Sequence, residues 1–477
     1  MTTADSRAAV RDSRPACRAA NEPFAPRILI DCGDYHLGNL GDVAMLQVTV
    51  ARLHELLPNA TLGVVTHDPA ALAMHCPHAA PVPLAGRDLW IGRGTLLGRA
   101  DRFLRLVPVL ADGGVEAALR RRHTDLFERL MQARLGRGTS HRESFEQFTQ
   151  ALSRADAVVL CGAGGITDHA RVWALAVLEI FRRAASNGAA TAMFGHGLGP
   201  LADPALRRAA SQTLPGLDRL ALREGRLGPA LARELGVSDD RLAVTGDDAI
   251  ELAYDRRAAT LGDAIGVNLR VARSAGVGAD FIAPVGDCLR DAAAARGTAL
   301  LGLPIGRGVA SNDTATIRDV LARAASPAHP GADLDSPHLV IDRIGRCRMV
   351  VTGAYHAAVF ALGQGVPAVC LARSPYFLDK MQGLADQFGA GCIVVDMNGG
   401  DFPQRLRKAI DAAWETAPAV RDALLAAGAR QIQASRAAYA GFATMMRDRV
   451  PTRDIPARAG AIRGVDGART AAHGAAR

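Results

Sequence analysis

The sequence predicts an α/β protein with two Rossmann-like domains whose parallel sheets face a cleft. From Arg27 onward, short apolar runs alternate with helical patterns, which is the order produced by parallel strands joined by helical crossovers. This order breaks off near residue 255, and a second series of similar size begins near residue 264. With 477 residues, of which 49% are hydrophobic and 22% charged, the chain is long enough to fill two such cores.

The first series begins with a buried strand, RILIDCG (27–33), followed by a helical pattern over 42–58. Residues 85–150 then become Arg-rich and helix-like, so we expect a helical insertion near 87–150 inside a domain spanning 27–255. An amphipathic helix is predicted over 170–188. The remaining strand-like runs of this domain are TLGVVTHD (61–68), ADAVVLCGAGG (155–165), ATAMFGHGLGP (190–200), LDRLALREG (217–225) and RLAVTGDDAI (241–250).

The second series predicts another domain over 256–420, joined to the first by the linker-like stretch YDRRAATLGD (254–263). Closing helices are expected over 421–450, and disordered tails over 1–26 and 451–477. The strand-like runs are AIGVNLRVA (264–272), TALLGLPIG (298–306), HLVID (338–342), RMVVTG (348–353), PAVCLA (367–372) and GCIVVDM (391–397).

The positive charge is unevenly distributed along the chain. The formal net charge is +8, and residues 87–142 alone contribute +6 while 451–477 contribute +3. This placement favours contact with an anionic ligand, an acidic glycan or an anionic membrane surface, although solvated arginine faces would give the same pattern. Aromatic residues make up 4% and no recognition motif is visible, so we expect no nucleic-acid partner.

The N-terminal residues lack the apolar core of a secretory signal, and no apolar run reaches the roughly 18 residues of a membrane span. We therefore expect a cytoplasmic protein, with peripheral contact at the inner membrane face left open. The eight cysteines are scattered, which predicts reduced structural thiols. The HCPH stretch at 75–78 is interpreted as a surface loop, so no metal site is expected.

Ligands of open parallel sheets bind beyond the carboxyl ends of the strands. The first such loop here is DCGDYHLGNLGD (31–42). Asn39 and Gly41 lie where backbone N–H groups at a helix start can hold an anion or a polar acceptor. Asp42 begins the predicted helix, where it can cap the helix or accept a proton from an attacking hydroxyl.

A second loop, LCGAGGITD (160–168), follows a strand with Gly162, Gly164 and Gly165 close together. Such glycines let a ligand approach the main chain, although they also serve packing alone. In the third loop, GHGLGP (195–200), His196 is interpreted as structural.

The fourth loop joins the strand RMVVTG to a helix, and His356 falls in the first turn of that helix. A helix N-terminus disfavours the charged imidazolium, which suits a neutral imidazole that exchanges protons. A histidine bonded to a neighbouring loop would also fit this position.

Four cations lie at or near strand ends of the two series. Arg223, Arg270 and Arg373 each follow a strand-like run, and Lys380 lies in SPYFLDKMQGL. Arginine offers bidentate contacts to phosphate and carboxylate. Together these residues predict a site for an anionic small molecule.

The same loops resemble those of the polysaccharide pyruvyl transferase family. The resemblance extends from about residue 27 to about 395, with a gap at the Arg-rich insertion. The segments that carry it are GNLGD (38–42), CGAGG (161–165), GHGLGP (195–200), LREGRLGPALARELGV (222–237), VTGDDAIELA (244–253) and VTGAYHAAVFALGQGVPAV (351–369).

The resemblance implies a fold like that of GT-B glycosyltransferases and transfer of a pyruvyl group from phosphoenolpyruvate to sugar hydroxyls of a glycan or a lipid-linked sugar, with formation of a ketal. It implies His356 as the acid that protonates the enol carbon, and Arg270 and Arg223 as ligands of the donor phosphate and carboxylate. Such chemistry requires no metal and no organic cofactor.

The chain departs from its relatives at one point. Many of them carry Arg-Leu-His where this chain has Ala354, Tyr355 and His356. Tyr355 can donate a hydrogen bond but supplies no charge, so Arg373, Lys380 or another cation has to compensate. Two other functions stay open, namely a GT-B glycosyltransferase with a nucleotide-sugar donor and a non-catalytic binding protein.

Overall fold

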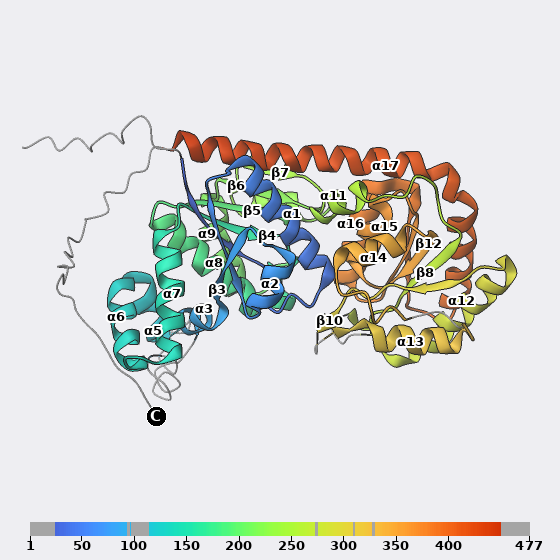
Figure 1. Ribbon diagram of the computed structural model, residues 1–477, viewed down its shortest axis with the longest axis horizontal. Helices are drawn as coiled ribbons and strands as arrows, with labels where there is room; N and C mark the ends of the chain where they lie inside the picture. The colour runs from blue at the N-terminus through green and yellow to red at the C-terminus, as the bar shows by residue number, and fades with distance from the viewer. Residues whose placement is uncertain are drawn as a thin grey trace, which may run out of the picture. The chain divides into compact units, whose positions relative to one another are not determined.

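The computed structural model describes residues 24–449, with gaps at 93–95, 97–113, 272–274, 309–310 and 327–329. Residues 1–23 and 451–477, and with them nearly all of the two predicted tails, lie outside this part of the chain. Two parallel sheets with helices on both faces make up the described fold, as predicted (Figure 1).

The first sheet has seven parallel strands in the order β3-β2-β1-β4-β5-β6-β7. The apolar residues of its central strands β1, β4, β5 and β6 are buried on both faces, which explains why these strands are continuous apolar runs, whereas the edge strands β3 and β7 are largely exposed or half-buried. The strands are β1 (Arg27–Asp31), β2 (Thr61–Thr66), β3 (Ala79–Pro83), β4 (Ala157–Cys161), β5 (Ala190–His196), β6 (Arg219–Leu222) and β7 (Leu242–Val244).

Helices cover both faces of this sheet, and the described part of the Arg-rich segment is helical, as predicted. It forms helices α5 to α7 in the crossover from β3 to β4. The helices of this half are α1 (Leu40–Leu56), α2 (Pro69–His75), α3 (Leu84–Ile91), α5 (Gly114–Arg122), α6 (Thr124–Leu135), α7 (Ser140–Arg154), α8 (Arg171–Ser186), α9 (Pro204–Thr213), α10 (Gly228–Glu234) and α11 (Ala249–Asp255).

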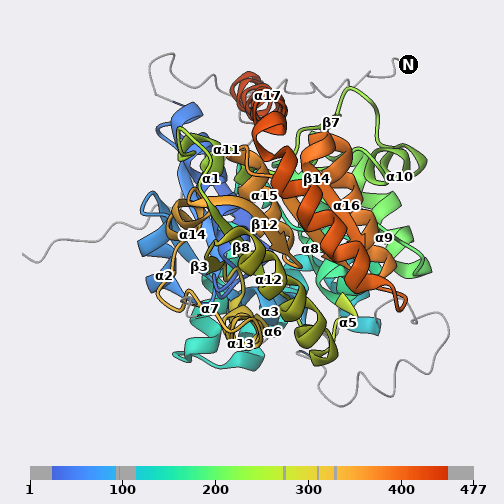
Figure 2. The same ribbon diagram turned by 90° about the vertical axis from the view of Figure 1, so that its right-hand side faces the viewer.

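The second sheet has five parallel strands in the order β14-β13-β12-β8-β9, and Figure 2 turns this half toward the viewer. A short hairpin, β10 (Arg307–Gly308) and β11 (Ser311–Asn312), stands apart from it. The strands and helices are β8 (Ala264–Asn268), α12 (Ile282–Arg296), β9 (Leu300–Gly302), α13 (Asp313–Arg323), α14 (Pro337–Ile344), β12 (Cys347–Thr352), α15 (Tyr355–Gly363), β13 (Ala368–Ala372), α16 (Pro375–Phe388), β14 (Cys392–Asp396) and α17 (Phe402–Asp448).

The strand prediction for HLVID (338–342) is wrong, because this segment belongs to helix α14. A five-residue apolar run does not distinguish a strand from one buried helical turn. Pro337 occupies the first helical turn, where its fixed φ suits the helix. Val340, Ile341 and Ile344 are all buried, which is helical rather than alternating spacing.

The closing helical segment is longer than predicted. Helix α17 begins at Phe402, not near residue 421, and continues without interruption to Asp448 with Pro418 inside it. It packs on strands of both sheets (Figure 1). In the described residues, no helix combines the length and the apolar character that crossing a bilayer requires.

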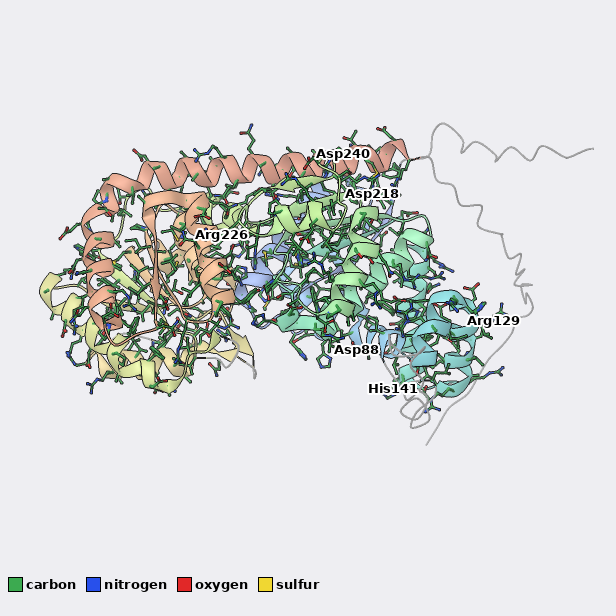
Figure 3. The ribbon with its side chains drawn as sticks, turned by 180° about the vertical axis from the view of Figure 1, so that it is seen from behind. Asp88, Arg129, His141, Asp218, Arg226 and Asp240 are labelled. Atoms are coloured by element: carbon green, nitrogen blue, oxygen red, sulfur yellow. The ribbon has the colours of Figure 1, made fainter. Side chains whose placement is uncertain are left out.

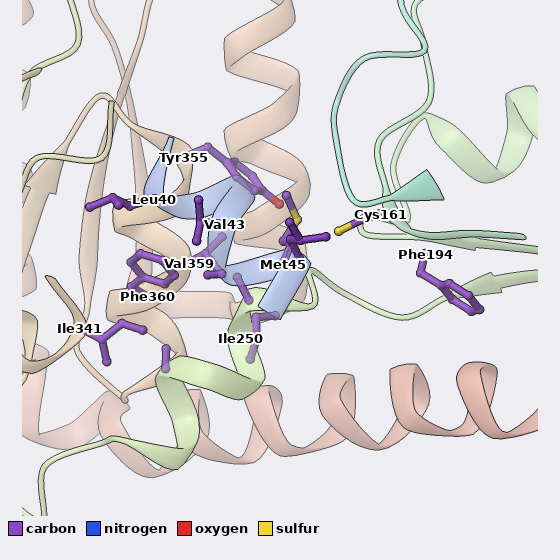
Figure 4. Packing of buried hydrophobic residues seen from close by; sticks show 14 of the residues in the cluster. Leu40, Val43, Met45, Cys161, Phe194, Ile250, Ile341, Tyr355, Val359 and Phe360 are labelled. Atoms are coloured by element: carbon purple, nitrogen blue, oxygen red, sulfur yellow. The ribbon is translucent and has the colours of Figure 1, made fainter. Parts of the chain in front are cut away.

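A continuous core joins the two halves, because α1, α11, α15 and α17 pack on one another. Figure 4 shows Val43 and Met45 of α1 beside Val359 of α15 and Ile250 of α11. A buried ion-pair cluster lies in the same layer, where Arg52 contacts Asp248 and Glu251. The packing of these four helices joins the two halves.

The described cysteines are free thiols, as predicted. The HCPH interpretation needs correction, because His75 ends helix α2 and both His75 and Cys76 are buried rather than part of a surface loop. No group of residues with metal-binding potential occurs among the described side chains.

Both sheets change the direction of their strand order at a defined point. In the first sheet the change lies between β1 and β4, and in the second between β8 and β12. Such switch points leave a crevice beyond the strand ends, where ligands of open α/β sheets bind. The loops after these four strands, together with the first turns of the helices that follow them, contain most of the site residues predicted from the sequence.

Candidate functional site

The loop after β1 starts helix α1 at the edge of the second half. Asn39 caps the helix, because its Oδ1 accepts hydrogen bonds from the N–H groups of Gly41 (3.0 Å) and Asp42 (3.4 Å). The helix therefore begins at Leu40, and the capping role considered for Asp42 belongs to Asn39. The N–H of Leu40 donates to the carbonyl of Ile305, 2.9 Å away.

A buried carboxylate shapes the facing loop of the second half. Asp313 Oδ2 accepts hydrogen bonds from the N–H groups of Ile305 (3.0 Å) and Gly306 (2.8 Å) and from Asn268 Nδ2 (3.0 Å). Asn268 ends strand β8 at the second switch point. The loop at Ile305 and Gly306, which contacts the start of α1, is thus fixed by Asp313 and Asn268, two side chains of the second half.

His356 lies in the first turn of α15, directly on the backbone of α1. Thr352 closes the preceding turn, because its Oγ1 accepts from the N–H of Ala354 (2.9 Å) and donates to the Ala354 carbonyl (3.0 Å). The imidazole is 5% exposed. A Cβ added at Gly41 would stand 1.9 Å from His356 Cγ, so only glycine leaves room for this ring.

Asp247, at the start of α11, faces the imidazole. Its Oδ2 lies 3.6 Å from His356 Nε2, an ionic contact slightly beyond hydrogen-bond distance, and 3.4 Å from Arg223 Nη1. Its Oδ1 accepts from the N–H of Ala249 (3.0 Å). Burial raises the pKa of Asp247, but His356 and Arg223 outweigh burial and the net pKa is lowered. The carboxyl group is therefore ionised at neutral pH.

Arg223, at the end of β6, is buried beside the glycine loop. A Cβ at Gly164 would lie 2.5 Å from its Nη2, so this glycine makes room for the guanidinium group. Tyr376 Oη donates to the Gly164 carbonyl (3.0 Å), which ties α16 to the loop. The Arg223 guanidinium carbon and Lys380 Nζ each lie 4.5 Å from the centre of the Tyr355 ring, within cation–π distance.

Lys380 is a cation in unfavourable surroundings. Burial lowers its pKa most, and the nearby charges of Arg223 and Arg270 lower it further. Asp42 and Asp247 act in the opposite direction, yet the net pKa lies well below the usual value. An anionic ligand at this point would relieve the repulsion among the three cations.

Asp42 lies in the same electrostatic environment. Burial raises its pKa, and Asp34 adds to the increase, while His356, Lys380 and Arg223 lower the pKa without cancelling the shift. A carboxylate with a raised pKa is a better proton acceptor than a solvated one. The base role considered for Asp42 therefore fits its position.

The other two glycines of the second loop serve close packing. A Cβ at Gly162 would lie 2.4 Å from Met45 Sδ, and one at Gly165 would lie 2.3 Å from the Trp173 ring. Gly162 thus lets α1 approach strand β4, and Gly165 lets α8 approach the loop. For Gly162 and Gly165, the structure therefore favours the interpretation that the glycine serves close packing.

The remaining two arginines have different surroundings. Arg270 follows β8, and its Nε is buried with no hydrogen-bond partner among the described residues. Arg373 donates to the Gly276 carbonyl (2.7 Å), and its guanidinium carbon lies 5.0 Å from the centre of the Phe281 ring. Arg270 therefore keeps hydrogen-bonding capacity for a ligand, whereas the Arg373 side chain contacts Gly276 and Phe281 of its own half.

Sequence reasoning missed Asp247 and Tyr376 as members of this cluster. The pair Asp247-Asp248 in VTGDDAIELA follows a strand directly, which was the available signal for Asp247. His196 is buried at the end of β5, and its structural role stays a prediction. Burial and the neighbouring Arg223 lower the pKa of His196 to about 3, so the ring is neutral.

Taken together, the two switch points meet at a buried imidazole between carboxylates, with Arg223, Lys380 and Arg270 close by. Such a cluster can donate a proton, accept a proton and hold an anion. Together these tasks use residues from both halves of the chain.

A family model agrees with this arrangement. The model described as "Polysaccharide pyruvyl transferase" matches residues 39–375 of the chain. The match includes the start of α1, both glycine loops and the His356 turn. No curated protein matches the sequence at a comparable level.

Solved structures share the two-sheet fold. A UDP-GlcNAc 2-epimerase from Neisseria meningitidis bound to UDP-GlcNAc has a TM-score of 0.50 and 10% identity, covering 87% of this chain and 98% of its own. A putative UDP-N-acetylglucosamine 2-epimerase from Listeria monocytogenes has a TM-score of 0.49 and 12% identity, covering 83% and 91%. A glycosyltransferase from Rickettsia africae has a TM-score of 0.47 and 10% identity, covering 89% and 100%. At these identities the likeness concerns the GT-B-like fold alone.

Proposed function

Because the chain belongs to the polysaccharide pyruvyl transferase family, we propose that it transfers a pyruvyl group from phosphoenolpyruvate to hydroxyls of a glycan or glycan precursor and forms a ketal. The observation that carries this proposal is the buried His356 ring, which lies on Gly41 and faces ionised Asp247 among three cations. The reaction needs no metal and no organic cofactor.

The cations account for binding of the donor. Phosphoenolpyruvate carries a phosphate and a carboxylate, and charge-assisted hydrogen bonds from arginine suit both groups. Arg270 contributes a buried Nε without a described partner, and Lys380 is repelled by Arg223 and Arg270 in the absence of an anion. We assign to Lys380 the positive charge that relatives carry on an arginine at the position of Ala354. The ammonium group of Lys380 lies over the Tyr355 ring.

The proton transfers follow from the positions of the imidazole and the carboxylates. His356 gives its proton to the methylene carbon of phosphoenolpyruvate, which becomes a methyl group. The electron-deficient C2 then accepts the oxygen of an acceptor hydroxyl, and Asp42 takes the proton of that hydroxyl. The bond between C2 and the phosphate oxygen breaks, phosphate leaves, and a second hydroxyl of the acceptor closes the ketal and loses its own proton.

Asp247 is a positioning residue in this scheme. It contacts both His356 and Arg223, so it orients the imidazole beside the guanidinium group.

Mass spectrometry tests the proposal against its two alternatives. The purified protein is incubated with phosphoenolpyruvate or with UDP-sugars and a panel of oligosaccharides. Pyruvyl transfer adds about 70 Da to the acceptor, whereas hexosyl transfer adds about 162 Da. A mass increase with UDP-sugars alone would support the glycosyltransferase alternative, and no increase with any donor would support a binding protein.

Arg270→Ala should chiefly raise KM for phosphoenolpyruvate, because the side chain binds the donor equally in the ground state and the transition state. We expect an increase of about tenfold, which corresponds to one lost charge-assisted hydrogen bond. Arg373→Ala is the matched control, because that arginine contacts only its own half. Equal KM values for both variants and the wild type would assign Arg270 a structural role.

The lowered pKa of Lys380 predicts a pH dependence of donor binding. Lysine binds an anion only when protonated, so kcat/KM for phosphoenolpyruvate should fall as pH rises through the lowered pKa, well below the usual lysine range. Lys380→Arg keeps the charge at all accessible pH values, so its profile should stay flat over that range. Identical alkaline limbs in both proteins would show that another group titrates.

A further inference from the structure

Two adjoining hollows form a long groove on the first half, remote from the second sheet. The first, of about 960 Å³, lies between helices α3, α5, α8 and α9, and the second, of about 620 Å³, lies between α5, α6 and α8. They share Arg121 and Arg182. Together they follow α8 from Arg171 to Ser186, and we call them the α8 groove.

The α8 groove is strongly basic. Nine arginines and three carboxylates line it among the described residues. Two of the exposed arginines are Arg122 at the end of α5 and Arg129 on α6, and Figure 3 labels Arg129 at the surface of the molecule. Burial lowers the pKa of Arg120 most; Glu179 and Glu116 raise this pKa, while Arg121 and Arg182 lower it further. The excess of arginines over carboxylates gives the groove a positive potential that attracts anionic groups.

The walls also offer apolar and aromatic surface. Val172 is 80% exposed, and Ala209 of α9 lines the opposite wall. Trp173 and Tyr35 lie at one end, where Trp173 Nε1 donates to Tyr35 Oη (2.9 Å). Sugar rings present apolar C–H faces that pack on aromatic side chains, while their hydroxyls stay hydrated.

The aromatic end of the groove is separated from the candidate site by one row of packed side chains. The Trp173 ring packs on Gly165, and it lies parallel to the buried His196 ring at 6.4 Å between centroids. Arg223, whose charge acts on His196, is buried on the site side of this row.

We propose that the α8 groove binds an acidic glycan acceptor whose carboxylate or phosphate groups face the arginines. This inference rests on the proposed function and names the class of its acceptor. A concave, elongated and basic groove suits an extended polyanion better than a flat membrane, because a bilayer does not reach the groove floor. Part of the positive charge of residues 87–142 is thereby assigned to substrate binding, namely that of the arginines in the groove lining, which are Arg87, Arg120, Arg121, Arg122 and Arg129.

The test measures direct binding, without donor and without turnover. Fluorescently labelled oligogalacturonate is titrated with the full-length protein, and neutral dextran oligomers of equal length serve as the uncharged comparison. The double variant Arg122→Glu/Arg129→Glu should weaken oligogalacturonate binding at least about tenfold, because two attractive charges of the groove become repulsive ones. Ala209→Trp narrows the groove without changing its charge and should weaken binding as well.

The double variant Arg318→Glu/Arg430→Glu is the matched control, because it makes the same charge change at exposed positions of the second half. Binding that weakens equally in this control, or that is unaffected by both groove variants, would overturn the proposal. Co-sedimentation with phosphatidylglycerol vesicles but no binding of oligogalacturonate would overturn it in favour of a membrane surface. The donor titration is independent of these measurements, so failure of the groove proposal and failure of pyruvyl transfer are distinguishable.

Discussion

Replacing His356 by glutamine should lower kcat for pyruvyl transfer by about a thousandfold, within the usual range of about 10²–10⁴ for loss of general acid catalysis. Glutamine fills most of the imidazole space but does not donate a proton to the enol carbon. The cations that bind the donor are untouched, so we expect KM for phosphoenolpyruvate to change little. The measurement is steady-state kinetics, with phosphate release as the readout.

The stability of this variant matters for its interpretation. His356 Nε2 has no hydrogen-bond partner in the described part of the chain, so the substitution breaks no hydrogen bond at that atom. We expect Tm to stay close to the wild-type value. His338→Gln is the control, because that histidine lies on α14, outside the proposed site. Wild-type turnover in His356→Gln would remove the imidazole from the mechanism.

Gly41→Ala should be almost as damaging, although alanine normally favours a helix over glycine by about 0.5–1 kcal/mol. Gly41 lies in the first turn of α1, so local propensity alone predicts a small gain in stability. The new methyl group, however, would overlap the imidazole of His356, with 1.9 Å to Cγ and 2.0 Å to Nδ1. The steric conflict far exceeds the propensity gain, so either the ring leaves its position or α1 shifts away from α15.

We expect kcat of Gly41→Ala to fall at least a hundredfold, because a displacement of about 1 Å costs an enzyme that much. Binding of phosphoenolpyruvate should persist, since the cations lie on other elements. Gly441→Ala is a matched helical control, because its methyl group would meet only Arg219 Nη2 at an ordinary 3.6 Å. Normal turnover in Gly41→Ala would mean that the imidazole does not need its observed position.

The sequence was informative wherever a pattern depended on local physics. Buried parallel strands are continuous apolar runs, so β1, β4, β5 and β12 were predicted close to their observed bounds. The loops after them followed from the rule that ligands bind beyond strand ends. The strand prediction for HLVID was wrong because a buried helical turn and a short buried strand have the same apolar composition.

Contacts between the halves could not be predicted in the same way. That Gly41 makes room for His356 depends on the packing of α1 against α15, which lie far apart in sequence. Asp247 looked like one of two acidic residues at a helix start, and only the fold brings it to the imidazole. Arg373 followed a strand just as Arg223 did, yet it is used within its own half.

The central claim is that the cations around His356 bind phosphoenolpyruvate, and a thermal-shift titration tests it most directly. A ligand that binds only the native state raises Tm with its concentration. The account predicts a rise with phosphoenolpyruvate that is reduced in Arg270→Ala and retained in His356→Gln. A rise with UDP-sugars and none with phosphoenolpyruvate would contradict it.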